Sequence, residues 1–246
     1  MNRQDWRIVA AQTRMELALT ARRGENILVT VIIPVILLVF FNSTGLIPSN
    51  GGSPLDYLVP GVLSIAIVST GMVNLGIATA YERYYGVLKR LGGSPLPRWG
   101  LLAAKAIAVL ALEVFQVILV VGVAVLGYGW SPHPSFGPLI VAMLLGTVAF
   151  SALGLAMAGA LRAEATLAIA NGLYLFFLLV GNVVLPSDHL PAFLRPVGAV
   201  LPVTALSDTL RFGWGSTGAN PTSSYVLLTG WAVVASVLAI RSFRWE

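Results

Sequence analysis

Six stretches of this sequence are mostly apolar for about twenty residues or more, and they limit the chain to a fold that crosses a bilayer. Only 10% of the 246 residues are charged, whereas soluble domains carry about 25%. We therefore expect a single-domain, all-α, polytopic membrane protein over residues 1–246. The six expected transmembrane helices are 27–47, 57–80, 100–127, 137–161, 165–186 and 223–243.

The basic residues indicate how these spans are oriented. Thirteen of the 15 Lys and Arg residues fall on the side that six spans give to both termini. Only Arg195 and Arg211 fall on the other side. Because cytoplasmic loops are enriched in Lys and Arg, we expect both termini in the cytoplasm. The net charge of +5 is then explained by orientation and by contact with anionic membrane lipids, and no nucleic-acid partner is expected.

The location follows from the same pattern. The first 26 residues are polar and lack the features of a signal peptide, so 27–47 is expected to be retained as a span. The abundance of Arg, Ala, Gly and Val is typical of a GC-rich bacterial genome. We therefore expect a multi-pass protein of the bacterial cytoplasmic (inner) membrane.

Two segments outside the spans also have helical patterns. Residues 1–26 predict an amphipathic interface helix with apolar residues on two stripes, which favours contact with lipid on one side and protein on the other. Simple adsorption to the membrane surface is the alternative. The segment 187–211 contains three prolines, so we expect two short outer helices there rather than a seventh span.

Catalytic and metal-binding motifs are absent from the sequence. It has no G-x-x-x-x-G-K-[ST] loop, no H-E-x-x-H and no G-x-S-x-G. His133 and His189 lie in different outer loops, and there is no cysteine. We therefore predict no catalytic residue, no metal site and no cofactor bound by this chain.

Polar residues inside the expected spans are candidates for a substrate path, because burying them is costly unless they serve a purpose. Glu113 is the acid in the middle of the third span, and Gln116 lies three residues on, on the same helix face. The full candidate set is Asn74, Glu113, Gln116, Asn171 and Asn182. The alternative is that these side chains hydrogen-bond neighbouring helices to one another.

The stretch "ERYYGVLKRLGGSPLPRWG" at 82–100 interrupts the apolar sequence with charge and tyrosines. A short helix is predicted over 82–91, ended by Gly92 or Gly93. It is expected to present Tyr84, Leu88, Leu91 and charged side chains to the cytoplasm, where Tyr and Arg are typical of protein interfaces. The alternative is ordinary cytoplasmic charge with interfacial tyrosines.

Three stretches, in order, resemble the membrane subunits of type-2 ABC exporters of the daunorubicin-resistance kind. The first is "TARRGENILVTVIIPVILLVFF", and the second, "ERYYGVLKRLGGSPLPRWGLLAAK", resembles the family pattern E-R-E-x-G-T-L-x-R-L-x-x-[ST]-P-x-x-R, with a lysine further on. The third is "LLVGNVVLPSDHLPAFLRPVGAVLPVTALSDTLR". Residues that match the second and third patterns include Gly86, Arg98, Lys105, Gly181, Leu190, Thr204 and Leu210.

This resemblance implies a function and partners. It implies a permease without ATPase activity of its own, powered by two ABC ATPase subunits that bind ATP and Mg, and paired with a second permease, identical or related. The coupling helix that contacts an ATPase would comprise Glu82, Arg83, Tyr84, Gly86, Leu88, Lys89, Arg90 and Leu91. Outer re-entrant helices would cap the pathway, with Pro186, Pro191, Pro202 and Arg211 in the matching pattern.

The expected cargo is an amphipathic drug or a lipid-like molecule, exported across the cytoplasmic membrane in the manner of a multidrug efflux system. Three alternatives stay open. The chain could export a polysaccharide or a lipid conjugate, it could be a proton-coupled secondary transporter that uses Glu113, or it could be a membrane scaffold without transport.

Overall fold

The structure is a computed structural model, and every regular element that it describes is a helix. The described residues are 3–22, 32–44, 53–93, 98–184, 186, 190–215 and 221–242. Their helices are α1 (Arg3–Arg22), α3 (Ile33–Thr44), α4 (Pro54–Ile67), η2 (Val68–Asn74), α5 (Leu75–Tyr84), α6 (Val87–Gly92), α7 (Arg98–Tyr128), α8 (Phe136–Ala160), α9 (Ala163–Val180), α10 (Arg195–Ala199), α11 (Pro202–Gly213) and α12 (Pro221–Ser242).

Five helical segments are long and apolar enough to cross a membrane, and they match five of the six expected spans. They are Pro54–Tyr84, Gly100–Tyr128, Phe136–Ala160, Ala163–Val180 and Pro221–Ser242. Within the first expected span, 27–47, the structure describes the 12-residue apolar helix α3. Residues 27–31 and 45–47 of that prediction lie outside the described residues.

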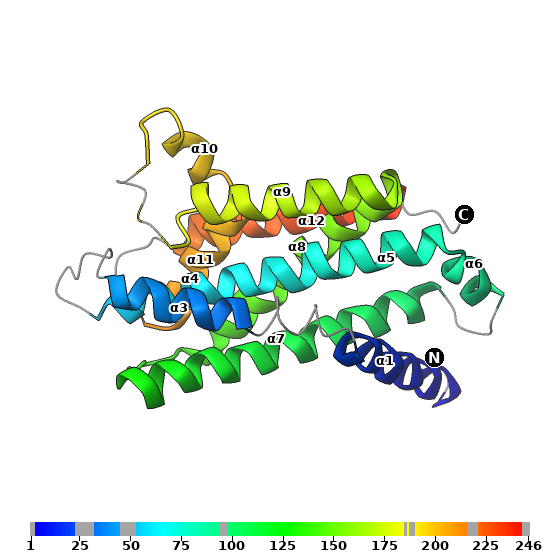
Figure 1. Cartoon of the computed structure of the whole chain (residues 1–246), viewed down its shortest axis with the longest axis horizontal. Helices are drawn as coiled ribbons and strands as arrows, with labels where there is room; N and C mark the ends of the chain where they lie inside the picture. Colours follow the sequence, from blue (N-terminus) through cyan, green and yellow to red (C-terminus); the bar gives the residue numbers. More distant parts are fainter. Residues whose placement is uncertain are drawn as a thin grey trace.

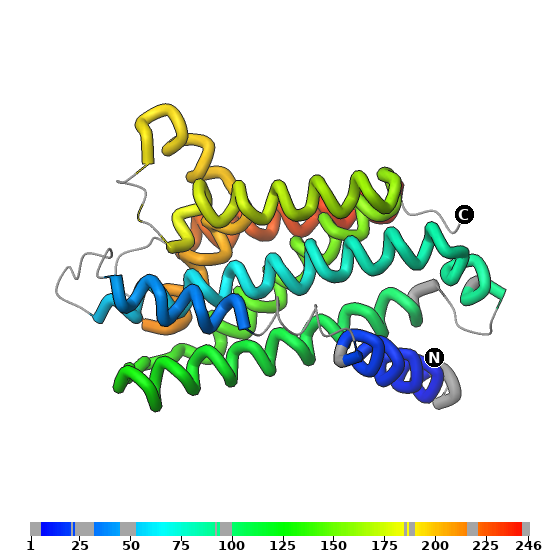
Figure 2. Tube along the Cα trace, in the orientation of Figure 1, coloured from blue at the N-terminus to red at the C-terminus, as the bar shows by residue number. Residues whose placement is uncertain are grey.

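The long helices lie roughly along one direction, so the short elements gather at two ends of the bundle (Figure 1). One end holds α1, α6 and the last turn of α12, and we call it the α6 end. The opposite end holds α10, α11 and the start of α4, and we call it the α11 end. The chain trace shows the same arrangement (Figure 2). At the α6 end, the Ser242 hydroxyl donates to the Ala156 carbonyl at 3.2 Å, which joins α12 to α8.

The second of the six expected spans, Pro54–Tyr84, comprises α4, η2 and α5 and is the most enclosed of the long apolar segments. It starts at a capping box, in which Ser53 Oγ accepts from the Leu55 amide and Asp56 accepts from the Ser53 amide. Its middle, η2, is π-helical. A Cβ added at Gly154 of α8 would lie 2.7 Å from the Met72 carbonyl oxygen, so this glycine lets α8 approach the π-helical backbone.

The fifth span is shorter than expected. The sequence predicts it over 165–186, but α9 ends at Val180. Asn182 follows with a positive φ of 51°, a left-handed conformation that Asn tolerates better than most residues. The chain therefore turns away from the bundle axis before residue 186, and this boundary of the prediction is wrong.

The two short helices expected within 187–211 are present as α10 and α11. The structure describes this segment from Leu190 onward, with 187–189 outside the described residues. Pro202 opens α11, where its missing N–H costs nothing. Almost every residue of α11 is buried, because the helix lies among α4, α8 and α12. This helix belongs to the core rather than to a polar surface loop.

The N-terminal helix α1 packs along the start of α7. Val9 and Thr13 are buried there, whereas 51% of Trp6 and 54% of Met15 remain exposed. A helix with one face on protein and bulky apolar side chains on the others fits the two-stripe interpretation better than simple adsorption.

Candidate functional site

The predicted coupling helix, 82–91, is two helical pieces rather than one. The second span continues as α5 through Tyr84, and α6 starts only at Val87. Between them, Gly86 has φ 69° and ψ 16°, a left-handed conformation that favours glycine. The continuous-helix prediction is wrong because this glycine, together with Tyr85, forms a turn. The turn changes which of the predicted residues face outward.

Glu82 and Arg83 face the bundle and not the exterior. Glu82 pairs with Lys105 of α7, and Arg83 donates to the backbone carbonyls of Gly159 and Leu161. These contacts fasten the end of α5 to α7 on one side and to the α8–α9 turn on the other. The expectation that both residues belong to an outward-facing helix is wrong on geometry.

Leu88 is also inside. It is 1% exposed and packs against Leu101, with Ile8 and Leu91 beside them. An amphipathic helix buries one stripe, and in α6 that stripe holds the leucines. The predicted presentation of Leu88 to the cytoplasm is therefore wrong, since this side chain anchors α6 to α1 and α7.

Four side chains of the predicted set and its turn do face outward. Tyr84 and Tyr85 are 65% and 66% exposed, and their rings meet edge to face at a centroid distance of 5.1 Å. Lys89 and Arg90 are exposed on α6. We call these four residues the α6 patch. It combines two aromatic rings with two positive charges, as protein interfaces often do.

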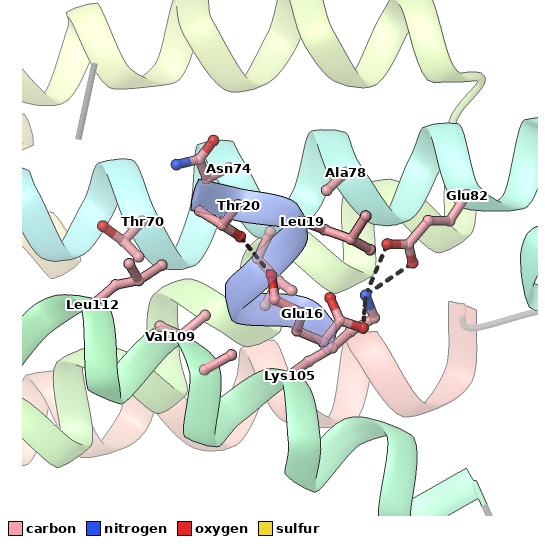
Figure 3. A pocket seen from close by; sticks show the side chains of 12 residues that line it. Glu16, Leu19, Thr20, Thr70, Asn74, Ala78, Glu82, Lys105, Val109 and Leu112 are labelled. Atoms are coloured by element: carbon pink, nitrogen blue, oxygen red, sulfur yellow. Dashed lines mark hydrogen bonds and ion pairs between the residues drawn. The ribbon is translucent and has the colours of Figure 1, made fainter. Parts of the chain in front are cut away.

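A buried lysine joins three helices just beneath the α6 patch. Lys105 Nζ lies 3.0 Å from Glu16 Oε1 of α1 and 2.8 Å from Glu82 Oε2 of α5 (Figure 3). The lysine side chain is 2% exposed, and the glutamates are 14% and 13% exposed. One cation shared by two carboxylates offsets part of the cost of burying all three. We call this group the Lys105 triad.

Beside the Lys105 triad is a cavity of about 50 Å³ between α1, the second span and α7. Thr70 and Asn74 line it from the π-helical stretch, and Leu112 lines it from α7 (Figure 3). Asn74 Nδ2 is buried without a hydrogen-bond partner among the described residues. The space suits water molecules, which would satisfy such a group, and is far smaller than a drug-sized pocket.

Glu113 and Gln116 lie on one face of α7, as predicted, but each side chain contacts a different neighbour. Gln116 Oε1 accepts from Thr70 Oγ1 at 3.1 Å, and Glu113 Oε2 is hydrogen-bonded to Thr147 Oγ1 of α8. The Thr147 oxygen also lies 2.8 Å from the Met143 carbonyl oxygen. The Thr147 hydroxyl therefore has two acceptors within reach, the Glu113 carboxyl group on α7 and the Met143 carbonyl of its own helix.

The three asparagines of the predicted path are far from forming one surface. Asn74 lines the cavity beside the Lys105 triad. Asn171 is exposed on α9, and its amide donates to the Leu167 carbonyl of its own helix at 2.8 Å. Asn182 is at the α11 end, where its side-chain oxygen accepts from Tyr57 at 2.7 Å. The sequence therefore grouped residues that the fold separates.

A second polar cluster occupies the α11 end, centred on Arg211. Its guanidinium donates to the carbonyls of Asn182 at 2.7 Å and Val183 at 3.2 Å, and to Asp208 at 3.1 Å. It also stacks over the Tyr57 ring, 3.7 Å from the centroid. Arg211 is only 7% exposed. It ties α11 to the turn after α9 and to α4.

The predicted cap prolines have different surroundings. Pro202 is buried at the start of α11, Pro186 is partly buried, and Pro191 is exposed. A further contact closes the same end: Trp130 Nε1 donates to Asp56 at 2.8 Å, and the Trp130 ring packs on Trp214. Within the described ranges, no three His, Cys, Asp or Glu side chains are grouped in a way that could hold a metal ion.

Sequence reasoning missed the Lys105 triad, although part of its signal is visible. Lys105 is the only Lys or Arg between Leu101 and Tyr128, so a buried partner could be expected for it. Nothing in the sequence indicates that the partners are Glu16, 89 residues earlier by numbering, and Glu82. The Tyr57–Asn182 contact has no sequence signal either, because it joins α4 to the turn after α9, two segments that are far apart in the sequence.

Sequence comparison identifies the family of this chain. The profile of the family described as "ABC-2 type transporter" matches residues 9–213. The chain therefore belongs to the ABC-2 type transporter family, and it is a membrane permease, a transport subunit rather than an ATPase. Permeases of this family function with ABC ATPase subunits.

Several curated proteins are similar to this chain. The "Putative transport permease ycf38" of Porphyra purpurea is 28% identical over 220 residues, which cover 85% of this chain and 74% of the relative. The "Probable multidrug ABC transporter permease YbhR" of Escherichia coli K12 is 24% identical over 69% of this chain and 48% of its own length. "Heme exporter protein B" of Paracoccus denitrificans is 28% identical over 78% and 77%. This chain thus matches about half the length of YbhR.

Proposed function

We propose that this chain is half of the membrane pathway of a bacterial ABC exporter that moves an amphipathic drug or lipid-like molecule out across the cytoplasmic membrane. In this proposal, it pairs with a second permease, identical or related, and with two ATPase subunits on the cytoplasmic side. The α6 end is cytoplasmic, α3 belongs to a sixth span, and the α11 end faces outward.

The single observation that carries the proposal is the α6 patch. Two exposed tyrosines, at the end of α5 and in the turn after it, and two exposed cations on α6 lie at the end of the bundle that also holds α1 and the end of α12. The helix is held by the buried Leu88, and α5 is fastened directly to α7 through Glu82. A force applied to α6 by an ATPase would therefore reach α1, α7 and the second span together.

The cargo class is supported by the exposed faces of the spans. Long apolar side chains are exposed on α7, α9 and α12, among them Ile118, Leu179 and Val226, which are each at least 66% exposed. Faces of this kind suit lipid, a second permease or an apolar cargo. One relative is named as a probable multidrug permease and another as a heme exporter protein, and both names fit a cargo with a large apolar part.

The α6 patch can be tested without disturbing the fold. We expect Arg90→Glu combined with Tyr84→Ala to abolish co-purification of the ATPase and its stimulation by the permease, because the contact would lose a ring and reverse a charge. Arg241→Glu is the matched control, since it reverses an exposed charge at the same end but on α12. Unchanged co-purification with the double variant would contradict the coupling role. Leu88→Asp is unsuitable for this test, because Leu88 is buried.

A proton-coupled transporter is the second candidate, since Glu113 Oε1 is buried without a partner among the described residues. Glu113→Gln separates the two functions, because an amide can still donate to Thr147 but cannot release a proton. We expect transport to stay ATP-dependent with its pH profile unchanged. Loss of pH-dependent transport in a folded Glu113→Gln protein would favour proton coupling.

A further inference from the structure

The α11 end contains a cavity of about 450 Å³ that the coupling mechanism does not use. It lies between the turn after α9, the helices α10 and α11, and the start of α12. Its polar lining comes from Asn182, Arg195, Thr204, Asp208, Ser223 and Ser224. A volume of this size is in the range of small-molecule sites in proteins.

The charged members of this lining have opposite signs. Arg195 is an exposed residue that contributes a guanidinium, whose Nε donates to the Leu190 carbonyl at 3.1 Å. Asp208 contributes a carboxylate that is 25% exposed and already pairs with Arg211 through Oδ1. Burial raises the pKa of Asp208, and Arg211 lowers it in part. A second cation beside this carboxylate would further stabilise its charged form.

An apolar groove of about 380 Å³ continues from the cavity along α12. Leu227 lines both spaces, and Val226, Gly230, Trp231 and Val234 complete the groove. Ser223, Leu227, Trp231 and Val234 are spaced by three or four residues and so follow one face of α12. The indole of Trp231 is fixed by a hydrogen bond to the Val200 carbonyl at 3.0 Å.

The surface is therefore polar at the start of α12 and apolar further along the same helix. Since α12 is one of the long apolar spans, its start lies near the membrane surface and its later residues lie in the hydrocarbon core. A lipid headgroup in the cavity would let an acyl chain follow the groove toward the middle of the bilayer.

We propose that this cavity and groove form a binding site for one phospholipid that carries a primary ammonium next to its phosphate, of the phosphatidylethanolamine class. Arg195 binds the phosphate, Asp208 binds the ammonium, and one acyl chain lies against Trp231. The charges of the lining match this headgroup better than that of a purely anionic lipid, which would place no cation at Asp208. The inference does not depend on which cargo the exporter moves.

Lipid binding can be measured by native mass spectrometry of the purified full-length chain. The probes are phosphatidylethanolamine, phosphatidylcholine and phosphatidylglycerol with identical acyl chains. We expect phosphatidylethanolamine to bind about tenfold more tightly than the other two, because each of them lacks the N–H donors that Asp208 accepts. Equal affinities, or a preference for phosphatidylglycerol, would overturn the proposal.

Two variants test the two halves of the site. Arg195→Gln removes the phosphate contact and is expected to weaken phosphatidylethanolamine binding about tenfold. Arg162→Gln, an exposed arginine at the α6 end, is its control. Gly230→Leu fills the groove without a clash, because a Cβ there meets nothing within 4 Å. Gly122→Leu is the matched control, since Gly122 is equally open and lies on α7.

Each outcome bears on the proposal. Loss of binding in Arg195→Gln and Gly230→Leu, with both controls unchanged, supports a bound lipid in the stated orientation. Unchanged binding in either test variant overturns it. A chain that forms a dimer and binds no lipid, and whose dimer is broken by Gly230→Leu, shows instead that a second copy covers the groove.

Discussion

The two ends of the bundle both bury a basic side chain, but they hold it in different ways. Lys105 at the α6 end is surrounded by carboxylates from two other helices. Arg211 at the α11 end donates mainly to backbone carbonyls and stacks on Tyr57. Carboxylates on flexible side chains can follow a moving lysine, whereas carbonyls in a turn hold a planar guanidinium in one place. The comparison indicates that the ion pairs of Lys105 can rearrange if the α6 end moves, whereas the contacts of Arg211 hold the α11 end in one arrangement. We call this second arrangement the fixed closure.

The largest expected effect comes from Arg211→Ala. It leaves two backbone carbonyls and Asp208 without their buried donor, so we expect a loss of about 3–5 kcal/mol in the free energy of unfolding. Denaturant titration in lipid-free detergent measures it. Arg195→Ala, which removes an exposed arginine and its hydrogen bond to the Leu190 carbonyl at the same end, is the comparison and should cost about 1 kcal/mol or less. Equal stability of the two variants would contradict the idea of a fixed closure.

Lys105→Met should lower the free energy of unfolding by somewhat less, about 2–3 kcal/mol. The reason is that Glu16 and Glu82 are partly exposed, so water can solvate their charges once the lysine is gone. The specific result is faster hydrogen exchange in α1, with α11 unchanged. Adding Glu16→Gln and Glu82→Gln to this variant should recover much of the stability, since it removes the two facing charges. Failure of this rescue would mean that the lysine acts through packing alone.

Trp130→Phe tests how much the stability of the α11 end depends on contacts other than those of Arg211. The variant loses the hydrogen bond to Asp56 but keeps most of the contact with Trp214. We expect a cost of about 1 kcal/mol in unfolding free energy. Tyr128→Phe, which changes an exposed residue nearby, should have almost no effect. A Trp130→Phe protein as unstable as Arg211→Ala would show that the closure depends on Asp56 and not on the arginine.

Salt should produce the smallest difference. Raising the ionic strength from about 0.05 M to about 0.5 M weakens partly exposed ion pairs. Hydrogen exchange in α1 should therefore show that the free energy of local opening falls by less than about 1 kcal/mol. Exchange in α11 should not change, because most of the acceptors of Arg211 are uncharged carbonyls. A larger salt effect on α11 than on α1 would reverse the comparison.

Much of this fold follows from sequence because apolar length alone identifies a span. Five spans and the two short helices expected within 187–211 are present, and Pro202 marks the start of α11. The boundaries that fail are those set by single residues in a left-handed conformation. Gly86 lies in the turn that separates α5 from α6, and Asn182 follows the end of α9. Neither is distinguished in the sequence from ordinary glycine or asparagine.

The candidate site was only partly predictable, for a different reason. Helical spacing places Glu113 and Gln116 on one face, and the structure agrees. It does not say which helix each will contact, since that depends on long-range packing. Leu88 shows the same limit: an amphipathic pattern shows that a leucine stripe exists, but whether it packs inward or onto a partner depends on α1 and Leu101.

The π-helical stretch at 68–74 has a consequence for the whole second span. A π turn accommodates an extra residue, so the half of the span after it is rotated relative to what a continuous α-helix would give. Thr70 consequently reaches Gln116 on α7, while Asn74 faces the small cavity and Glu82 reaches Lys105. Deleting one residue here would restore α-helical phase and turn Glu82 away from its lysine. The π-helical stretch therefore sets how the second span is rotated, so that its side chains meet Gln116, the small cavity and Lys105 at the same time.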